Sequence, residues 1–439
     1  MTASHDTSAR ATLPAPHRLS VRLQKWKQPM LAFVLGQPSV QLLNLLTGFF
    51  LLRWLSKEEF AMFGVAFAFQ STVNQLTDLG FSASIVALAG ERGQEPAWLG
   101  RYLRAAWHYR TRLLGFTLLG AAVAFPLLTW RQDWGAGTKL LLFGAIALAV
   151  AGQSWMMYGS ALLVHRRLRD YYSPQITGAA VRLGLCAALY FTGLLSAWAV
   201  AWLGALVIGW TGWSYRRAAR DCVLEPAQSD PEANREMRRY LAPFIPGAIF
   251  YALQGQITVG IISVFGSTEQ LAEISAVGRL GQLFLFFNAF NAILLEPYFA
   301  RLPVQLIKRR YVLIVALAAI MGLALSAFGF MFPQPLLWLL GPKYGNLQQA
   351  IGWVVVTACI TYVANVMWTM HAARRWVYWW VTVTYIIVVV IAQVACAVTM
   401  DLSKTMQVIW FGAITALVIL GVTIANGIYG ISRAQQAGT

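Results

Sequence analysis

The chain has 439 residues, of which 58% are hydrophobic and only 12% are charged, and its mean hydropathy is +0.58. A soluble globular protein carries about twice that share of charged residues, so the composition excludes the soluble class and indicates a polytopic membrane protein. The 34 Lys and Arg exceed the 17 Asp and Glu and give a net charge of +17, whose meaning depends on where the charges lie.

The predicted elements begin with a polar, basic tail (residues 1–29) that lacks the apolar region of a signal peptide. Six apolar segments of bilayer-spanning length follow, near 30–54, 59–90, 112–129, 139–164, 172–193 and 196–215. A charged linker, 216–239, contains two prolines and precedes six more segments, near 240–265, 268–300, 310–332, 349–370, 376–399 and 406–432. The segments predict an all-α membrane protein with about 12 transmembrane helices, an N-lobe (30–215), a C-lobe (240–432) and a short tail (433–439).

The Lys and Arg residues are distributed unequally between the two sides of this topology. With the N-terminus inside, 26 of them lie in inside segments, 6 lie in outside loops, and Arg182 and Arg279 lie within spans. The asymmetry predicts that both termini are cytoplasmic. Most of the net positive charge therefore belongs to the cytoplasmic loops and sets the orientation of the chain in the membrane. This removes the interpretation as a nucleic-acid-binding protein.

A short internal repeat relates the two halves. The stretches "WLSKEEFAMF" (54–63) and "FGSTEQLAEI" (265–274) match at an offset of 211, which pairs Ser56 with Ser267 and Glu58 with Glu269. Each stretch lies in the outside turn between the first two spans of its half. Twin halves are a common transporter architecture, with the substrate site between them near the middle of the membrane.

Polar side chains follow helical spacing on the first two spans of each half. The candidate cavity residues of this kind are Gln41, Asn44, Gln70, Asn74, Asp78, Gln254 and Gln282. Amide side chains also join helices to one another, so contacts between helices are the alternative explanation. Because the stripes fall on matching spans, we interpret them as the lining of a hydrated cavity.

Arginine residues mark the same region as a candidate anion site. Arg279 and Arg182 lie at membrane depth, where a cation costs at least about 3 kcal/mol and therefore faces protein or water. A guanidinium group is always charged and matches phosphate in a bidentate manner. Arg53, at the outer end of the first span, is a candidate for the rim. The alternative for Arg279 is a structural ion pair with Asp78 or Glu296.

Several stretches resemble polysaccharide flippases of the multidrug/oligosaccharidyl-lipid/polysaccharide exporter superfamily. The resemblance rests on "LLRWLSKEEFAMFGVAFAFQSTVNQLTDLGFSASIVALAG", "AVGRLGQ", "LLEPYFARL" and "LLGPKYGNLQQAIGWVV". It implies two six-helix lobes around a cationic central cavity, and movement of polyprenyl-pyrophosphate-linked oligosaccharide across the bacterial inner membrane. Arg53 and Arg279 fall in matched motifs, whereas Arg182 does not. "SKEEFAMF" departs from the family pattern at Ala61 and Met62.

The leading hypothesis is therefore a flippase that works by alternating access in surface polysaccharide (lipopolysaccharide or exopolysaccharide) biosynthesis. Its expected partners are the lipid-linked oligosaccharide, the bilayer, and the polysaccharide polymerase and chain-length regulator proteins. A cation-coupled drug exporter of the same superfamily is the alternative. Such exporters need carboxylates in the cavity for ions and cationic drugs, and here Asp78 is the clearest deep acid, set against two deep arginines. A membrane polymerase or ligase ranks lower because no sizeable outside loop is present, and a scaffold ranks lower because of the polar stripes. Neither a phosphate-binding loop nor a metal-ligand spacing occurs, so we expect no enzyme, no cofactor and no metal.

Overall fold

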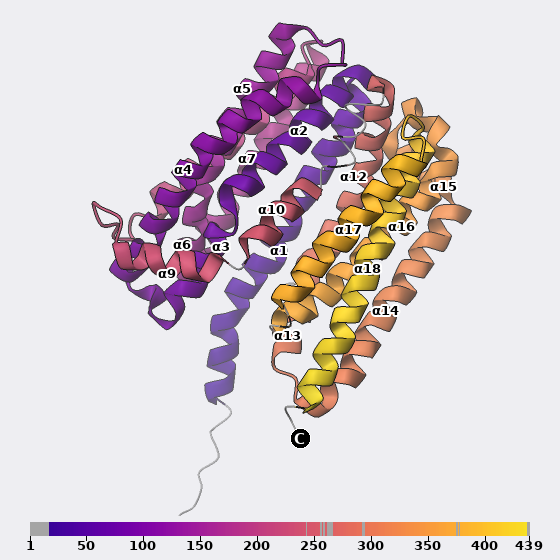
Figure 1. The fold of residues 1–439 in the computed structure, drawn as a ribbon. Coiled ribbons are helices and arrows are strands. Elements are labelled where there is room, and N and C mark those ends of the chain that lie inside the picture. Colours follow the sequence, from indigo (N-terminus) through magenta and orange to yellow (C-terminus); the bar gives the residue numbers. More distant parts are fainter. Residues whose placement is uncertain are drawn as a thin grey trace, which may run out of the picture.

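The computed structural model describes residues 17–242, 244–254, 257, 260, 267–291, 295–374, 376 and 378–436. These residues form helices joined by short connections, and no strand occurs among them. Six of the helices are long and apolar enough, by length and composition, to cross a membrane. The predicted all-α membrane class is confirmed, with the two halves of the chain forming two lobes (Figure 1).

The N-terminal half supplies the indigo to magenta helices of Figure 1. They are α1 (His17–Trp54), α2 (Lys57–Asp78), α3 (Phe81–Ala89), α4 (Pro96–Leu128), α5 (Ala136–Gln153), α6 (Gly159–Val164), α7 (Leu168–Phe191) and α8 (Ala197–Ala219). Two helices begin earlier than expected. The first starts at His17, inside the predicted tail, whose residues 1–16 lie outside the described part of the chain. The other is α4, which contains the predicted third span and starts at Pro96, a residue preorganised for a first helical turn. Most of the connection predicted between the second and third spans (91–112) is therefore helical.

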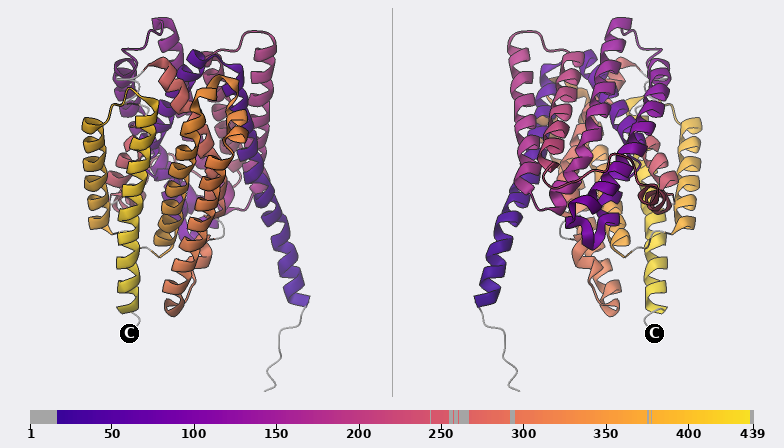
Figure 2. Two further views of the ribbon diagram at one scale, coloured as in Figure 1. Left: turned by 90° about the vertical axis from the view of Figure 1, so that its right-hand side faces the viewer. Right: turned by 90° about the vertical axis from the view of Figure 1, so that its left-hand side faces the viewer.

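The C-terminal half supplies the other lobe. Its helices are α10 (Ile245–Gln254), α12 (Thr268–Phe290), α13 (Glu296–Ala300), α14 (Val304–Met331), α15 (Pro333–Leu340), η4 (Pro342–Leu347), α16 (Gln348–Ala373), α17 (Trp379–Thr399) and α18 (Thr405–Gln436). The predicted seventh span, 240–265, lies partly outside the described residues, as do residues 437–439 of the predicted tail. Figure 2 shows the first turns of α1 and the last turns of α18 at the same end of the molecule.

The predicted linker is not a plain connection, because it ends in the amphipathic helix α9 (Pro231–Leu241). Asp230 caps this helix: it accepts a hydrogen bond from the backbone N–H of Glu232 at 2.9 Å and pairs with Arg101 of α4 at 2.6 Å. The backbone N–H, and then Arg101, hold the pKa of the Asp230 carboxyl below its usual value. Ala233, Met237 and Leu241, spaced four apart, are buried. The linker helix is thereby fixed to the N-terminal lobe.

The long second segment breaks where its backbone turns left-handed. Leu79 and Gly80 have φ values of 41° and 88°, which end α2 and start α3. Glycine adopts such a conformation without the steric cost that a Cβ atom brings. The eighth segment is also divided, since α12 ends at Phe290 and α13 begins at Glu296. Both predicted segments, 59–90 and 268–300, are longer than the roughly 20 residues that a span needs because each contains an interrupted helix.

The internal repeat corresponds to two equivalent helix starts. Ser56 caps α2 by accepting from the N–H of Glu59 at 3.1 Å, and Ser267 caps α12 by accepting from the N–H of Gln270 at 3.3 Å. Glu58 and Glu269 lie in the first turns, where a carboxylate favours the helix dipole. The two sequence stretches therefore supply the same N-terminal cap and first-turn carboxylate to the corresponding helix of each half.

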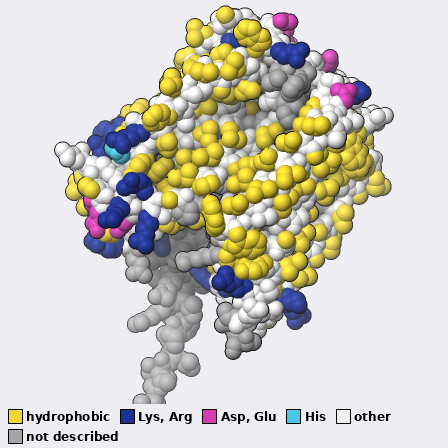
Figure 3. Space-filling view, in the orientation of Figure 1, with side chains coloured by type: hydrophobic (Ala, Val, Ile, Leu, Met, Phe, Trp, Pro, Cys, Tyr) yellow, Lys and Arg dark blue, Asp and Glu magenta, His cyan; other side chains and the backbone are white. Residues whose placement is uncertain are grey.

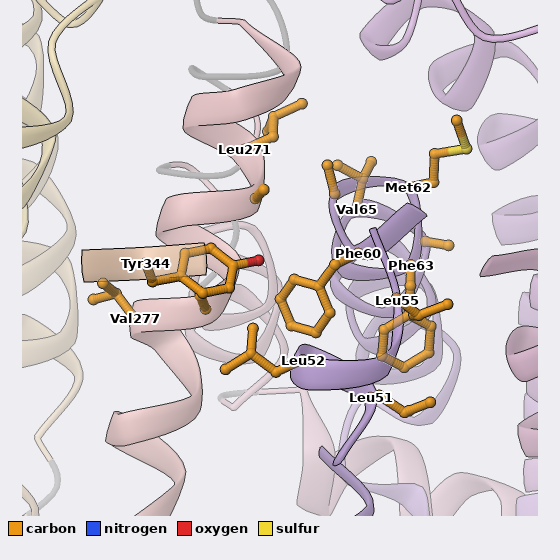
Figure 4. Close-up of a cluster of buried hydrophobic side chains, with 14 of the residues drawn as sticks. Leu51, Leu52, Leu55, Phe60, Met62, Phe63, Val65, Leu271, Val277 and Tyr344 are labelled. Carbon is orange, nitrogen blue, oxygen red and sulfur yellow. The ribbon is translucent and has the colours of Figure 1, made fainter. Parts of the chain in front are cut away.

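The two lobes meet at the end of the molecule where α2 and α12 begin, which we call the closed end. Gly64 of α2 and Ser275 of α12, again 211 residues apart, touch so closely that a Cβ atom on Gly64 would lie 2.3 Å from Ser275 Oγ. Figure 4 shows the apolar cluster at this end, with Leu52, Phe60 and Tyr344 between the α2 and α12 ribbons. Lys57 pairs with Glu269 at 2.5 Å, and Thr268 donates to Gln132 at 2.7 Å.

The opposite end differs in shape and in charge. There the ends of the lobes near α9 and near α13 lie apart (Figure 1). Figure 3 shows a broad hydrophobic face between the two ends, with most of the visible Lys and Arg side chains at its left-hand and lower edges. An apolar belt bordered by basic residues is the surface expected of a protein that spans a bilayer.

The contact between Gly64 and Ser275 generates a stability prediction. Gly64→Leu should destabilise the closed end, because overpacking a tight contact typically costs about 1–3 kcal/mol. The purified variant should therefore unfold at a lower temperature than the wild type. Gly115→Leu is the matched control, because a Cβ atom on Gly115 meets nothing within 4 Å. Equal unfolding temperatures for both variants would mean that this crossing does not hold the lobes together.

Candidate functional site

Arg279 lies between the lobes, on the face of α12 that packs against α2. It is eleven residues, or about 16 Å, from the start of α12, close to half of a hydrocarbon core of about 30 Å. The guanidinium carbon is 6.0, 5.5 and 5.1 Å from the ring centres of Phe60, Phe63 and Phe67. Three aromatic rings of the N-terminal lobe therefore face one cation of the C-terminal lobe.

The polar partners of Arg279 are few. Its side chain donates one hydrogen bond, from Nη1 to Gln282 Oε1 at 3.1 Å, and only 9% of the residue is exposed. On α1 the small Gly48 leaves room for the guanidinium group, since a Cβ atom there would lie 3.4 Å from Nη1. Among the described residues no carboxylate forms an ion pair with Arg279. Gln282, predicted from spacing, is thus brought to the site.

Arg182 supplies a second cation from the N-terminal lobe. It lies on α7, packed against Gly204 of α8, and its Nε atom is buried without a hydrogen-bond partner among the described residues. Arg182 belongs to the N-terminal lobe and Arg279 to the C-terminal lobe. Neither side chain forms an ion pair with an acidic residue in the described part of the chain.

The proposed ion pair between Asp78 and Arg279 is wrong. Asp78 pairs instead with Arg110 of α4, which also donates to Asn74 Oδ1 at 3.0 Å and to Ser154 Oγ at 3.1 Å. The second candidate partner, Glu296, is exposed at the start of α13 and forms no ion pair among the described residues. Neither Asp78 nor Glu296 therefore forms an ion pair that would compensate the charge of Arg279.

Arg110 is the functional-site candidate that sequence reasoning missed. It was counted as a loop charge, yet it is 2% exposed on α4. With Asp78 and Asn74 it lines a cavity of about 450 Å³ that also borders Tyr251 of the other lobe. Arg110 lies two residues before the predicted third span (112–129), so hydropathy alone places it outside the membrane, whereas α4 starts at Pro96 and carries it into the lobe.

The other predicted site residues lie elsewhere. Arg53 ends α1 at the closed end, 4.5 Å from the ring centre of Trp338, where it donates to the Trp338 carbonyl and lines a separate cavity of about 470 Å³. Gln254 accepts from the Tyr385 hydroxyl at 3.5 Å in a C-lobe cavity. Gln41 and Gln70 are partly buried and Asn44 is exposed, and no hydrogen bond joins these three to the described residues. The predicted set thus forms several sites rather than one.

Comparison with known proteins identifies the fold. No protein-family model matches the chain, and no curated protein matches it. An inward-facing multidrug-resistance MATE transporter of the MOP superfamily is similar at a TM-score of 0.67 and 15% identity, over 91% of this chain and 96% of that one. An outward-facing MATE transporter gives 0.59 and 14%, over 93% and 94%. A MOP superfamily transporter from Pyrococcus furiosus, described by the reverse polarity of its binding pocket, gives 0.63 and 15%, over 94% and 95%. The chain therefore has a MATE-like transporter fold.

The partner of Asp78 generates a double-mutant prediction. Asp78→Asn should lower the unfolding temperature, because it leaves the buried Arg110 guanidinium without its carboxylate; since Asp78 is 25% exposed, the cost should be less than the value of about 3–5 kcal/mol typical of a fully buried pair. Adding Arg110→Gln should restore much of that loss, since it removes the charge left without a partner.

The matched control is Asp78→Asn combined with Arg279→Gln, which should not recover stability. Thermal unfolding of the purified variants measures all three. Recovery with Arg279→Gln but not with Arg110→Gln would overturn the assignment of the pair.

Proposed function

We propose that this protein is a flippase that moves a polyprenyl-pyrophosphate-linked oligosaccharide across the bacterial inner membrane during surface polysaccharide biosynthesis. The observation that carries the proposal is the pair Arg279 and Arg182, two cations on opposite lobes without a carboxylate partner among the described residues; Arg279 is 9% exposed, and the Nε atom of Arg182 is buried. A buried charge is costly unless an opposite charge compensates it. A pyrophosphate is an anion of suitable charge and matches guanidinium geometry.

Substrate charge links binding to movement of the lobes. The two guanidinium groups lie on different lobes, and neither forms an ion pair with a described residue. A pyrophosphate between them adds two attractions, one to each lobe. Because a ligand shifts a conformational equilibrium only by its differential affinity for the two states, the bridging anion favours the state in which both arginines approach it. The polyprenyl chain stays in the bilayer beside the lobes.

The closed end is suited to repeated opening. Lys57 and Glu269, which join the lobes there, are 33% and 62% exposed. An exposed ion pair contributes about 0–1 kcal/mol, so its loss is a small barrier to opening. The fold is also similar to MATE transporters in both inward-facing and outward-facing conformations, which supports alternating access.

The drug-exporter alternative is less well supported by the charges. A cationic drug or coupling ion needs an available carboxylate at membrane depth. Asp78 is engaged by Arg110, and the 650 Å³ cavity of the C-lobe has no acidic residue in its lining. The reverse polarity described for the Pyrococcus furiosus transporter indicates that pocket charge varies within this superfamily. A role as a polymerase or ligase has no support from the similar structures, which are transporters.

The substrate assignment predicts a charge-dependent loss of export. Arg279→Ala should abolish surface polysaccharide export while protein abundance stays normal, because the substrate's counter-charge is lost. Arg279→Lys should retain part of the activity, because it keeps the charge but not the bidentate geometry. Arg112→Ala, on an exposed part of α4, is the control and should export normally. Normal export by Arg279→Ala would remove the arginine from the transport mechanism.

The inner-membrane orientation, with cytoplasmic termini and linker, predicts a labelling pattern. All four native cysteines are buried, so they do not interfere with labelling of an engineered site. Leu224 in the linker is 68% exposed, and Trp130 in a loop on the other side is 79% exposed. A membrane-impermeant thiol reagent should label Trp130→Cys in intact spheroplasts, and Leu224→Cys only after lysis. The reverse pattern would invert the topology.

A further inference from the structure

A large cavity in the C-lobe has no role in binding the pyrophosphate. Its volume is about 650 Å³, within the range of small-molecule sites, and it lies between α10, α16, α17 and α18. Thr361 and Asn365 also line a neighbouring cavity of about 350 Å³, whose wall includes Gly278 and Gly281, one residue before and two residues after Arg279 on α12. The large cavity therefore shares a wall with a cavity that borders the helix segment carrying the central cation.

The lining of this cavity combines aromatic rings with amides. Tyr251 stacks on Tyr385 with ring centres 5.4 Å apart, and Trp368 lies 6.3 Å from Tyr251. Gln254, Asn365 and Gln393 add carboxamide groups, and none of the lining residues is charged. Tyr251 and Trp368 are 41% and 39% exposed, so the rings present accessible faces rather than forming a closed core.

The polar groups of the cavity have spare hydrogen-bonding capacity. Thr415 is 6% exposed, and its Oγ1 atom has no hydrogen-bond partner among the described residues. Gln393 is 7% exposed, and no hydrogen bond joins its amide to the described part of the chain. Leaving a buried polar group such as the Thr415 hydroxyl unpaired costs about 1–3 kcal/mol, and the Gln393 amide is free to bond a ligand or water.

The chemistry of the lining limits the class of ligand. The absence of charged lining residues disfavours an ion, and the amides disfavour an alkyl chain. A polyhydroxylated ring suits both features: its C–H face packs on an aromatic ring, and its hydroxyl groups donate to and accept from carboxamides. Sugars are ligands of this kind.

We propose that this cavity binds a sugar residue of the lipid-linked oligosaccharide, with Trp368 and Tyr251 as the stacking platform and Gln393 as a hydroxyl partner. The inference rests on the proposed flippase function and adds to it the site of saccharide recognition. The arginines then bind the part common to all such substrates, and the C-lobe cavity distinguishes one saccharide from another.

The test measures binding of two probes to the purified full-length protein in nanodiscs. One probe is the polyprenyl-pyrophosphate oligosaccharide extracted from the host membrane, and the other is synthetic polyprenyl pyrophosphate without sugar. The wild type should bind the first about tenfold more tightly, the equivalent of one or two net hydrogen bonds or stacking contacts. Trp368→Leu and Gln393→Leu should each lose most of this difference and keep the affinity for the sugar-free probe.

Trp379→Leu is the matched control, because Trp379 is on α17 but 64% exposed and outside the cavity lining. It should behave as the wild type. Unchanged discrimination in both cavity variants, or equal loss of both probes, would overturn the sugar site while leaving the flippase proposal intact. Failure of the wild type to bind either probe would instead overturn the proposed function, and the sugar site with it.

Discussion

Two guanidinium groups without acidic partners, one on each lobe, are the constraint on which the rest of this structure depends. Among the described residues no carboxylate forms an ion pair with Arg279 or with Arg182. Burying such charges is unfavourable. In the proposed mechanism, an anion that bridges the lobes both relieves this cost and couples substrate binding to lobe movement.

The internal repeat explains where this constraint is located. At an offset of 211 the two halves place equivalent residues at one crossing, as in the contact between Gly64 and Ser275. The same offset pairs Arg279 with Ala68 of α2, a small buried residue. The repeat thus builds a symmetric contact between Gly64 and Ser275 at the closed end. Four residues further along α12 the symmetry ends, because Arg279 is matched by Ala68 on α2. The α2–α12 pair therefore carries one cation at this depth instead of two.

Patterns that depend on neighbouring residues could be predicted from the sequence. Hydropathy located the spans, and the repeat paired Ser56 with Ser267, the residues that the structure shows to cap α2 and α12. The partner of Asp78 could not be predicted, because Arg110 reaches it from another helix and local spacing does not reveal such contacts. The start of α4 was also placed too late, since its first turns are basic and extend beyond the apolar segment. Arg279 was recognised because a cation within an apolar run is unusual in any arrangement.

The most direct test of the central claim is a transport measurement with purified protein in proteoliposomes. It compares a fluorescent polyprenyl-pyrophosphate oligosaccharide with a cationic dye, each in the presence and absence of an ion gradient. The account predicts movement of the lipid-linked oligosaccharide between leaflets, inhibition by sugar-free polyprenyl pyrophosphate, and no transport of the dye. Gradient-driven transport of the dye, without movement of the lipid-linked oligosaccharide, would contradict it.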